Sequence, residues 1–216
     1  MATRRLRTIH SLAIVALSGL AIAGCGTQDG SNPAGSALPS APASAIPGTT
    51  EGATTADIQA AKLEPCPVSD ANVAPVADGL PDLTLACLGE GKPVRLAGVR
   101  GTPMVVNVWA SWCGPCKAEL PMMGEFYRDN REKLALLGID MADDRVAALA
   151  MAGSTAMTFP SVQDPKSEIR AGLKVIGVPT TLFVRPDGTI AGRTTVVTSR
   201  EELSVLVEKY LGVKAT

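Results

Sequence analysis

The sequence predicts an α/β fold: a central mixed sheet flanked by helices, with an N-terminal β-hairpin extension. The first observation is the run Met104–Trp109, which is apolar and β-branched as expected of a buried central strand. The second is the alternation of strand and helix that continues from there, beginning with a helical stretch at residues 113–128. The third is a Pro-Asp-Gly turn at residues 186–188, which joins two strands as a hairpin and so makes the sheet mixed rather than purely parallel.

The other elements follow in chain order. Residues 83–88 alternate like a strand, and after a turn signal at residues 89–92 the short run 94–96 pairs back on them as the hairpin extension. Farther along we expect a strand at 134–139, a helix at 143–151, a short helix at 167–173 and strands at 180–184 and 189–197. The last helix begins at Ser199, which forms a capping box with Glu202.

Residues 1–24 have the pattern of a signal peptide. Three arginines precede an apolar stretch at residues 12–23 that is too short to span a bilayer comfortably. The stretch ends in Gly24-Cys25, which resembles the lipobox of bacterial lipoproteins, where the cysteine sulfur receives a diacylglycerol. The alternative is an ordinary secretory signal in which Cys25 is incidental. The lipobox predicts lipidation at Cys25 and a protein anchored to the extracytoplasmic side of the cell membrane.

Residues 25–62 are rich in Gly, Ser, Ala, Pro and Thr, contain no aromatic residue and show almost no apolar periodicity. Such a segment cannot bury enough apolar surface to offset the entropy lost on ordering it. We therefore expect a flexible, lipid-anchored linker at residues 25–62. The single domain then occupies residues 63–216, a length sufficient for one hydrophobic core.

The composition excludes several kinds of chemistry. His10 is the only histidine, so removal of residues 1–24 leaves none. This excludes Ser-His-Asp and Cys-His catalysis as well as histidine-ligated zinc or haem, and we expect no cofactor. Without the three arginines of the signal peptide, the 20 basic residues become 17 against 21 acidic ones, a net charge of −4. A mildly acidic surface gives no reason to expect nucleic-acid binding.

Four cysteines follow Cys25, and two of them form the motif Cys113-Gly-Pro-Cys116 between the central strand and the next helix. Zinc is a competing interpretation, but structural zinc sites have two short-spaced pairs, so we expect no metal. At a helix start, the dipole and the free backbone N–H groups stabilise a thiolate at Cys113. The sequence predicts Cys113 as the nucleophile and Cys116, one turn deeper, as the thiol that attacks the mixed disulfide.

Cys66 and Cys87 precede the motif, and Cys87 lies in a predicted strand. A disulfide between them closes a loop of about 22 residues and contributes on the order of 3 kcal/mol to stability. The alternative is a second redox pair that relays electrons with Cys113. We favour a structural disulfide, because neither cysteine has an activating helix start or base nearby.

Residues 107–121, NVWASWCGPCKAELP, resemble the active-site segment of thioredoxin-fold proteins of the TlpA/ResA type, and residues 177–181, GVPTT, resemble their cis-proline segment. The resemblance covers about residues 81–212. It implies a thioredoxin fold and a cis peptide bond at Pro179. We expect Trp112 to border the disulfide, and the backbone at Val178 and Pro179 to pair with an extended substrate.

The resemblance also implies a function: a thiol–disulfide oxidoreductase that reduces disulfides in exported proteins, including apocytochrome c during cytochrome c maturation. Its electrons then come from an integral membrane protein. Gly-Pro between the cysteines resembles the thioredoxin dipeptide, which favours reduction, whereas strong oxidants usually carry a histidine there. Two alternatives stay open: a peroxiredoxin-like peroxidase, since the two groups share a fold, and a non-catalytic lipoprotein whose thioredoxin-like domain only binds a partner.

Asn107 departs from thioredoxin, which has a buried aspartate at this position that assists proton transfer to the resolving thiol. Glu119 is the candidate replacement, because Cys-x-x-Cys-Lys-x-Glu-x-Pro resembles the TlpA/ResA pattern. Three residues after Cys116, Glu119 lies on the same helix face, and partial burial raises the pKa of such a carboxyl into a range useful for proton transfer. The alternative is a solvated acid favoured only by the helix dipole.

Overall fold

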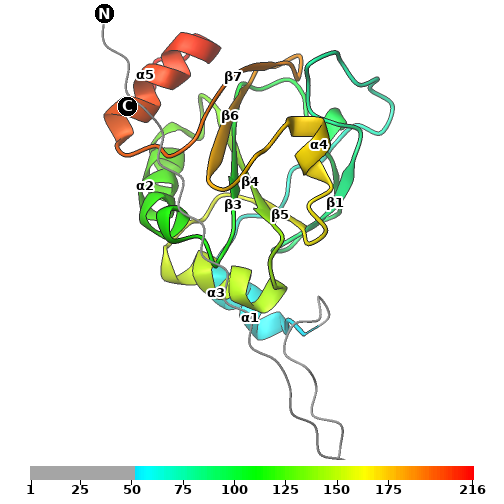
Figure 1. Cartoon of the computed structure of the whole chain (residues 1–216), viewed down its shortest axis with the longest axis vertical. Helices are drawn as coiled ribbons and strands as arrows, with labels where there is room; N and C mark the ends of the chain where they lie inside the picture. Colours follow the sequence, from blue (N-terminus) through cyan, green and yellow to red (C-terminus); the bar gives the residue numbers. More distant parts are fainter. Residues whose placement is uncertain (1–51) are drawn as a thin grey trace, which may run out of the picture. The chain divides into compact units, whose positions relative to one another are not determined.

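The computed structural model describes residues 52–216, so the predicted signal peptide, Cys25 and most of the predicted linker lie outside the described residues. The elements in order are α1 (Thr55–Ala61), β1 (Thr84–Cys87), β2 (Val94–Arg95), η1 (Leu96–Gly98), β3 (Met104–Trp109), α2 (Gly114–Asn130), β4 (Ala135–Met141), α3 (Arg145–Ser154), β5 (Ser161–Asp164), α4 (Ile169–Leu173), β6 (Thr180–Val184), β7 (Ile190–Thr194) and α5 (Arg200–Leu211) (Figure 1). None of the helices in this part of the chain is long and apolar enough to cross a membrane.

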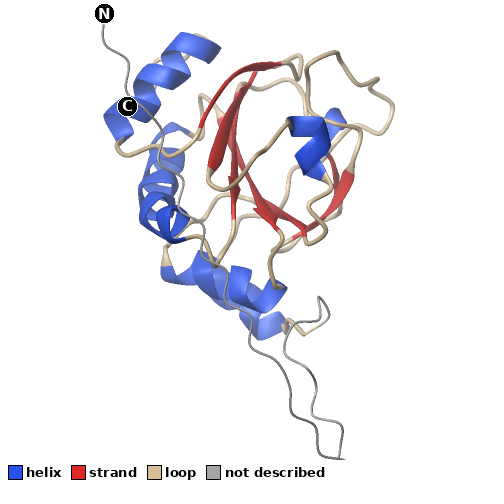
Figure 2. Ribbon diagram, viewed as in Figure 1, coloured by secondary structure: helices blue, strands red, loops and turns tan. Residues whose placement is uncertain are grey.

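The seven strands form one mixed sheet with the order β2-β1-β5-β4-β3-β6-β7, which confirms the predicted fold class. β3, β4 and β5 are parallel neighbours, whereas β6 runs antiparallel to β3, and β1 runs antiparallel to both β2 and β5. The hairpin between β6 and β7 places β7 at one edge of the sheet. Helices α2, α3 and α5 lie on one side of the sheet and α4 lies on the other (Figure 2).

β3 is the central strand of the core, as its β-branched sequence predicts. All six of its residues are buried, and their side chains alternate between two hydrophobic clusters. Val105 and Trp109 pack under α2 and α5, while Val106 and Val108 face the α4 side. Because the strand is buried on both faces, its C-terminal end is a fixed point from which the following loop leaves.

The folded part begins earlier than the predicted boundary at residue 63, so the predicted linker is wrong at its C-terminal end. Helix α1 packs against α3, with Ala61 buried (Figure 1). A capping box begins this helix, because the Thr54 side chain accepts the N–H of Asp57 and the Asp57 carboxylate accepts the N–H of Thr54. Ile58 packs against the core, and small residues allow a close approach of the two helices: a Cβ on Gly153 of α3 would lie 3.1 Å from the backbone oxygen of Ala60. The small-residue composition of this segment is therefore the reason that α1 was not predicted.

Two further details differ from the sequence prediction. β5 was not predicted, since its sequence Ser-Val-Gln-Asp carries polar residues, yet all four of its residues are buried between β1 and β4. The capping box of the last helix forms in part. Ser199 accepts the N–H of Glu202 as predicted, but the Glu202 carboxylate accepts the N–H of Thr198 rather than that of Ser199.

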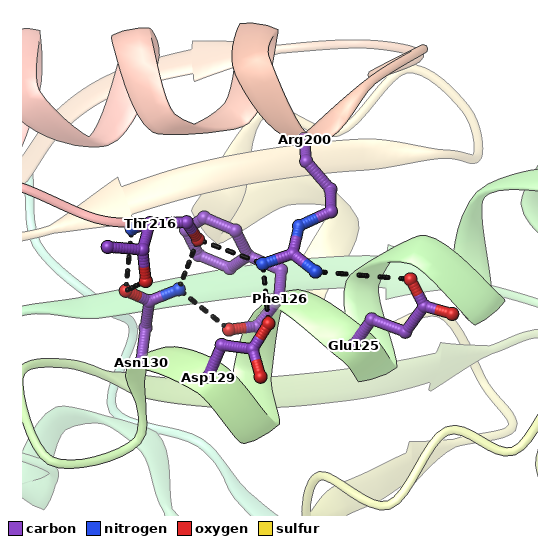
Figure 3. Close-up of polar contacts among 6 residues, drawn as sticks. All are labelled: Glu125, Phe126, Asp129, Asn130, Arg200 and Thr216. Carbon is purple, nitrogen blue, oxygen red and sulfur yellow. Dashed lines mark hydrogen bonds and ion pairs between the residues drawn. The ribbon is translucent and has the colours of Figure 1, made fainter.

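Polar contacts of Arg200, at the start of α5, fix that helix against α2 (Figure 3). One guanidinium nitrogen is 2.6 Å from a carboxylate oxygen of Asp129 and donates to the backbone oxygen of Thr216 at 3.0 Å, while the other is 4.0 Å from Glu125. Exposed ion pairs of this kind contribute at most about 1 kcal/mol each, so they orient α5 more than they stabilise it. With α5 so placed, residues 196–198 lie against α2.

Candidate active site

Cys113 and Cys116 lie at the N-terminus of α2, directly after the loop that leaves β3. Their Sγ atoms form a disulfide. Cys113 is the N-cap of α2, and its Sγ accepts the backbone N–H of Cys116 at 3.1 Å. A free N–H of the first helical turn thus points at the sulfur, which favours a thiolate there once the disulfide is reduced. Cys113 is 4% exposed and Cys116 1%, so Cys116 is the deeper of the two, as the sequence predicts.

The loop before Cys113 is tied to the loop after β4. The Asp143 carboxylate accepts hydrogen bonds from the backbone N–H of Ser111 and, at 2.7 Å, from its hydroxyl. The indole N–H of Trp112 donates to the backbone oxygen of Ala142 at 3.0 Å. Trp112, the residue directly before Cys113, is 60% exposed. The hydrogen bonds from Ser111 to Asp143 were not predicted, because in the sequence Asp143 has only the pattern of an acid at the start of a helix.

The Val178–Pro179 peptide bond is cis, as the family resemblance implies. In the β3–β6 register, Val108 is opposite Thr180, which places Pro179 next to the end of β3, from which the Cys113 loop leaves. The Thr180 hydroxyl donates to the backbone oxygen of Gly177 at 2.7 Å and steadies this turn. Pro179 and the loop that carries Trp112 therefore lie at the same end of two adjacent strands, β6 and β3.

Glu119 is buried rather than solvated. Only 3% of the residue is exposed. Burial raises the pKa of this carboxyl from 4.5 to about 7. Hydrogen bonding by the Val197 backbone and the Thr181 side chain lowers the same pKa, but by less. A carboxyl with a pKa near neutrality can both accept and return a proton under physiological conditions.

Asn107, which holds the position of the thioredoxin aspartate, is 1% exposed on β3. Its Nδ2 donates to the Thr181 hydroxyl oxygen at 3.2 Å, and its Oδ1 has no partner among the described residues. Asn107 cannot ionise. It binds the same threonine that influences the pKa of Glu119, so the two residues belong to one buried polar group next to the dithiol.

A pocket of about 320 Å³ opens beside the dithiol between α2 and the segment that precedes α5. Its lining consists of Pro115, Ala118, Glu119, Met122, Val196, Val197 and Thr198. Pro115 belongs to the cysteine motif and Glu119 provides the acidic group. Glu119 therefore lines a pocket that also borders the cysteine motif at Pro115.

Cys66 and Cys87 form a second disulfide, the predicted pair. It joins the segment after α1 to the end of β1, and Cys66 N–H also donates to the backbone oxygen of Glu90 at 3.0 Å. Gly91 adopts φ +130°, and a Cβ there would lie 3.0 Å from the Cys66 nitrogen, so this turn requires glycine. Within residues 52–216, no group of three His, Cys, Asp or Glu residues is arranged to hold a metal ion.

The fold, the cysteine pair at the start of α2 and the cis-proline beside it define a class: a thioredoxin-fold thiol–disulfide oxidoreductase. The sequence model of the AhpC/TSA family matches residues 76–193, which is more than half of the 216 residues. The chain belongs to the AhpC/TSA family.

Similar proteins agree with this class and with the TlpA/ResA resemblance. The chain is 30% identical over 125 residues to thiol-disulfide oxidoreductase ResA of Oceanobacillus iheyensis, a match that covers 56% of this chain and 65% of that protein. It is 28% identical over 134 residues to ResA of Geobacillus thermodenitrificans, covering 62% and 76%. A secreted Mycobacterium tuberculosis disulfide oxidoreductase, homologous to E. coli DsbE, superposes with a TM-score of 0.52 at 27% identity, covering 59% of this chain and 96% of that one.

Proposed function

We propose that this protein reduces disulfides in exported proteins, with Cys113 as the nucleophile and Cys116 as the resolving thiol. The observation that carries the proposal is the Cys113–Cys116 disulfide at the N-terminus of α2, where Cys113 Sγ accepts a helix N–H. The disulfide is the product state of such a reaction. An integral membrane protein with its own thiols is the proposed electron donor that returns the pair to the dithiol.

The reaction has two exchange steps. The Cys113 thiolate attacks one sulfur of the substrate disulfide, that bond breaks, and the released substrate sulfur takes up a proton. The Cys116 thiol then loses its proton and attacks Cys113 Sγ, so the mixed disulfide breaks and the second substrate sulfur leaves as a thiol. Two electrons have passed to the substrate, and the enzyme holds the Cys113–Cys116 disulfide.

Glu119 is the proposed base for the second step. It lies one turn after Cys116 on α2, and both residues are buried. Asn107 on β3 cannot ionise. We therefore assign the uptake of the Cys116 proton to Glu119, the acid of α2 that is closest to Cys116 in sequence. Its neighbours Thr181 and Val197 favour the ionised form, while burial favours the protonated form, and these opposed effects suit a group that changes charge in each cycle.

Replacing Glu119 by Gln should slow disulfide reduction on the order of tenfold or more at pH 7, because the resolving step loses its proton acceptor. The wild-type rate should show a rising limb near pH 7 that the variant lacks. The measurement is the rate of insulin reduction from pH 5 to 9. Glu125→Gln, on the exposed side of the same helix, is the matched control and should keep the wild-type profile. An unchanged profile in Glu119→Gln contradicts the proposed role.

The same substitution should change stability in a defined direction. The folded state keeps the Glu119 proton up to about pH 7 and the unfolded state loses it near pH 4.5. The free energy of unfolding therefore falls as pH rises through that window, by about 3 kcal/mol. Urea unfolding of Glu119→Gln should lack this contribution, so the variant should be more stable than wild type at pH 8. A less stable variant at pH 8 would count against a Glu119 carboxyl whose pKa is raised by burial.

Export and anchoring are also proposed. The charged start, the apolar stretch and the Gly24-Cys25 ending support export with lipidation at Cys25. The M. tuberculosis relative is described as secreted, which fits a location outside the cytoplasm. Apocytochrome c remains a proposed substrate on the basis of the family resemblance alone. We propose that Trp112, Val178 and Pro179 contact the substrate polypeptide.

Trapping of partners in cells tests the proposed function. A full-length Cys116→Ser variant should accumulate mixed disulfides at Cys113 with exported proteins, since the resolving thiol is missing. The control is the double variant Cys113→Ser, Cys116→Ser, which should trap none. If the Cys116→Ser variant also traps no partner, and the wild-type pair is permanently oxidised, the results would support a non-catalytic lipoprotein instead. Rapid consumption of peroxide with a dithiol donor would support the peroxiredoxin-like alternative.

A further inference from the structure

Another pocket lies next to Pro179, on the β7 side, and the proposed reaction does not use it. Its volume is about 360 Å³, and its lining consists of Lys174, Ile176, Thr180, Arg193, Thr194 and Thr195. These residues come from the segment between α4 and β6, from the start of β6 and from the end of β7, the strand at the edge of the sheet (Figure 1). Thr180 directly follows Pro179, so the pocket adjoins the backbone that is proposed to pair with the substrate.

The strand register places this pocket at the end of the sheet that carries the dithiol. Thr181 is opposite both Asn107 of β3 and Thr194 of β7, so the start of β6 lies between the end of β3 and the end of β7. Neighbouring strands are about 4.8 Å apart, so β3 and β7 are about 10 Å apart across β6. An extended polypeptide covers that span with about three residues. A substrate that is bonded to Cys113 and passes Pro179 can therefore reach the pocket.

The charged side chains of this pocket are basic. Lys174 and Arg193 line it, and among residues 52–216 no aspartate or glutamate does. The ion pairs in the described part of the chain include neither of these cations. Asp78 lines an adjoining hollow that both cations also border, but it forms an ion pair with neither. Arg193 is held in place, because its guanidinium donates to the backbone oxygen of Leu173 at 2.8 Å. A carboxylate that enters the pocket would thus meet two cations.

The apolar wall of the pocket is Ile176, two residues before Val178. A single exposed apolar side chain is common at a protein surface, but this one is 93% exposed and borders a pocket with two cations. The Thr180 hydroxyl donates to the backbone oxygen of Gly177 at 2.7 Å and fixes the segment that carries Ile176. An added Cβ on Gly177 would meet no atom within 4 Å, so a bound chain has room to approach this segment. The pocket therefore suits a side chain with an apolar stem and a negative end.

We propose that this pocket selects substrates: it binds a glutamate or aspartate side chain that lies two or three residues from the cysteine attacked by Cys113. Lys174 and Arg193 bind the carboxylate, and Ile176 contacts the CH₂ groups next to it. The inference rests on the proposed function, because the pocket can act only on a polypeptide that is already held at Cys113. It narrows the substrate class to disulfide-containing polypeptides with an acidic residue near the reacting cysteine.

The test compares peptides that differ at one residue. Each peptide has a single cysteine joined in a disulfide to 2-mercaptoethanol, and Glu, Gln or Lys stands at the second or third residue before or after that cysteine. The full-length, reduced protein is the enzyme, and kcat/KM is measured. At low salt, kcat/KM should be about fivefold higher for the Glu peptide of the favoured position than for its Gln counterpart, since charge pairs at a surface are weak. The difference should vanish at about 1 M salt, which screens such pairs.

A charge reversal separates recognition from a loss of structure. Lys174→Glu should reverse the preference, so that the Lys peptide reacts faster than the Glu peptide, whereas a poorly folded variant would slow all peptides alike. Lys92→Glu, at an exposed lysine between β1 and β2 near the other edge of the sheet, is the matched control and should keep the wild-type preference.

Two results would overturn the inference and leave the proposed function standing. One is equal reduction of Glu and Gln peptides at every position by the wild type, and the other is a wild-type preference in Lys174→Glu. If the wild type reduces none of the peptides and Cys116→Ser traps no partner, the proposed function fails and the inference fails with it.

Discussion

Replacing Cys113 by Ser should reduce insulin disulfide reduction on the order of 10³-fold or more, because the nucleophile is lost and a serine hydroxyl does not ionise near neutral pH. The helix N–H that now points at Cys113 Sγ would then face a neutral oxygen. The measurement is the initial rate of insulin reduction with a chemical dithiol as electron donor, at equal concentrations of folded protein.

The variant in which both Cys66 and Cys87 are Ser is the control for this loss. It should keep the wild-type rate at a temperature where it is folded, because the disulfide that it lacks joins the segment after α1 to the end of β1. That disulfide is not part of the Cys113–Cys116 pair. If that variant loses activity as completely as Cys113→Ser does, the second pair takes part in electron relay, contrary to the structural role that we propose.

Removal of the Cys66–Cys87 disulfide should lower the free energy of unfolding by on the order of 3 kcal/mol, since it closes a loop of about 22 residues in the unfolded chain. The local structure supports a stabilising role: Cys87 is buried and Cys66 N–H is bonded to Glu90. Urea denaturation of the Cys66→Ser, Cys87→Ser double variant measures the loss, with a lower midpoint at similar slope.

The matching comparison is the Cys113→Ser, Cys116→Ser double variant. The disulfide that this variant lacks closes a loop of only four residues in the wild type, so the same relation gives a smaller loss of stability, about 2 kcal/mol. A Cys66–Cys87 deletion that costs less than the Cys113–Cys116 deletion would contradict a structural role for the first disulfide.

Much of the fold follows from sequence because the decisive elements have strong local patterns. The β-branched run Met104–Trp109 needs burial on both faces, and the structure provides it. The predictions fail where burial depends on partners distant in sequence. α1 packs through small residues against Gly153, and β5 buries polar residues between two strands, so neither leaves a clear apolar period. The predicted linker at residues 25–62 was too long for that reason.

The site shows the same division. The spacing of Cys113 and Cys116 and the proline at position 179 are local signals, and they locate the disulfide and the cis bond. Burial of Glu119 could be stated only as one of two alternatives, because the covering segment at residues 196–198 comes from far along the chain.

The reduction potential of the Cys113–Cys116 pair tests the central claim most directly. The measurement equilibrates the protein with glutathione or dithiothreitol redox buffers and quantifies the oxidised fraction by thiol alkylation, with Cys66 and Cys87 replaced by Ser so that a single pair is read. A reductase with the thioredoxin-like Gly-Pro dipeptide should have a potential close to that of thioredoxin, about −270 mV. A potential close to that of DsbA, about −120 mV, would contradict reduction and indicate an oxidant.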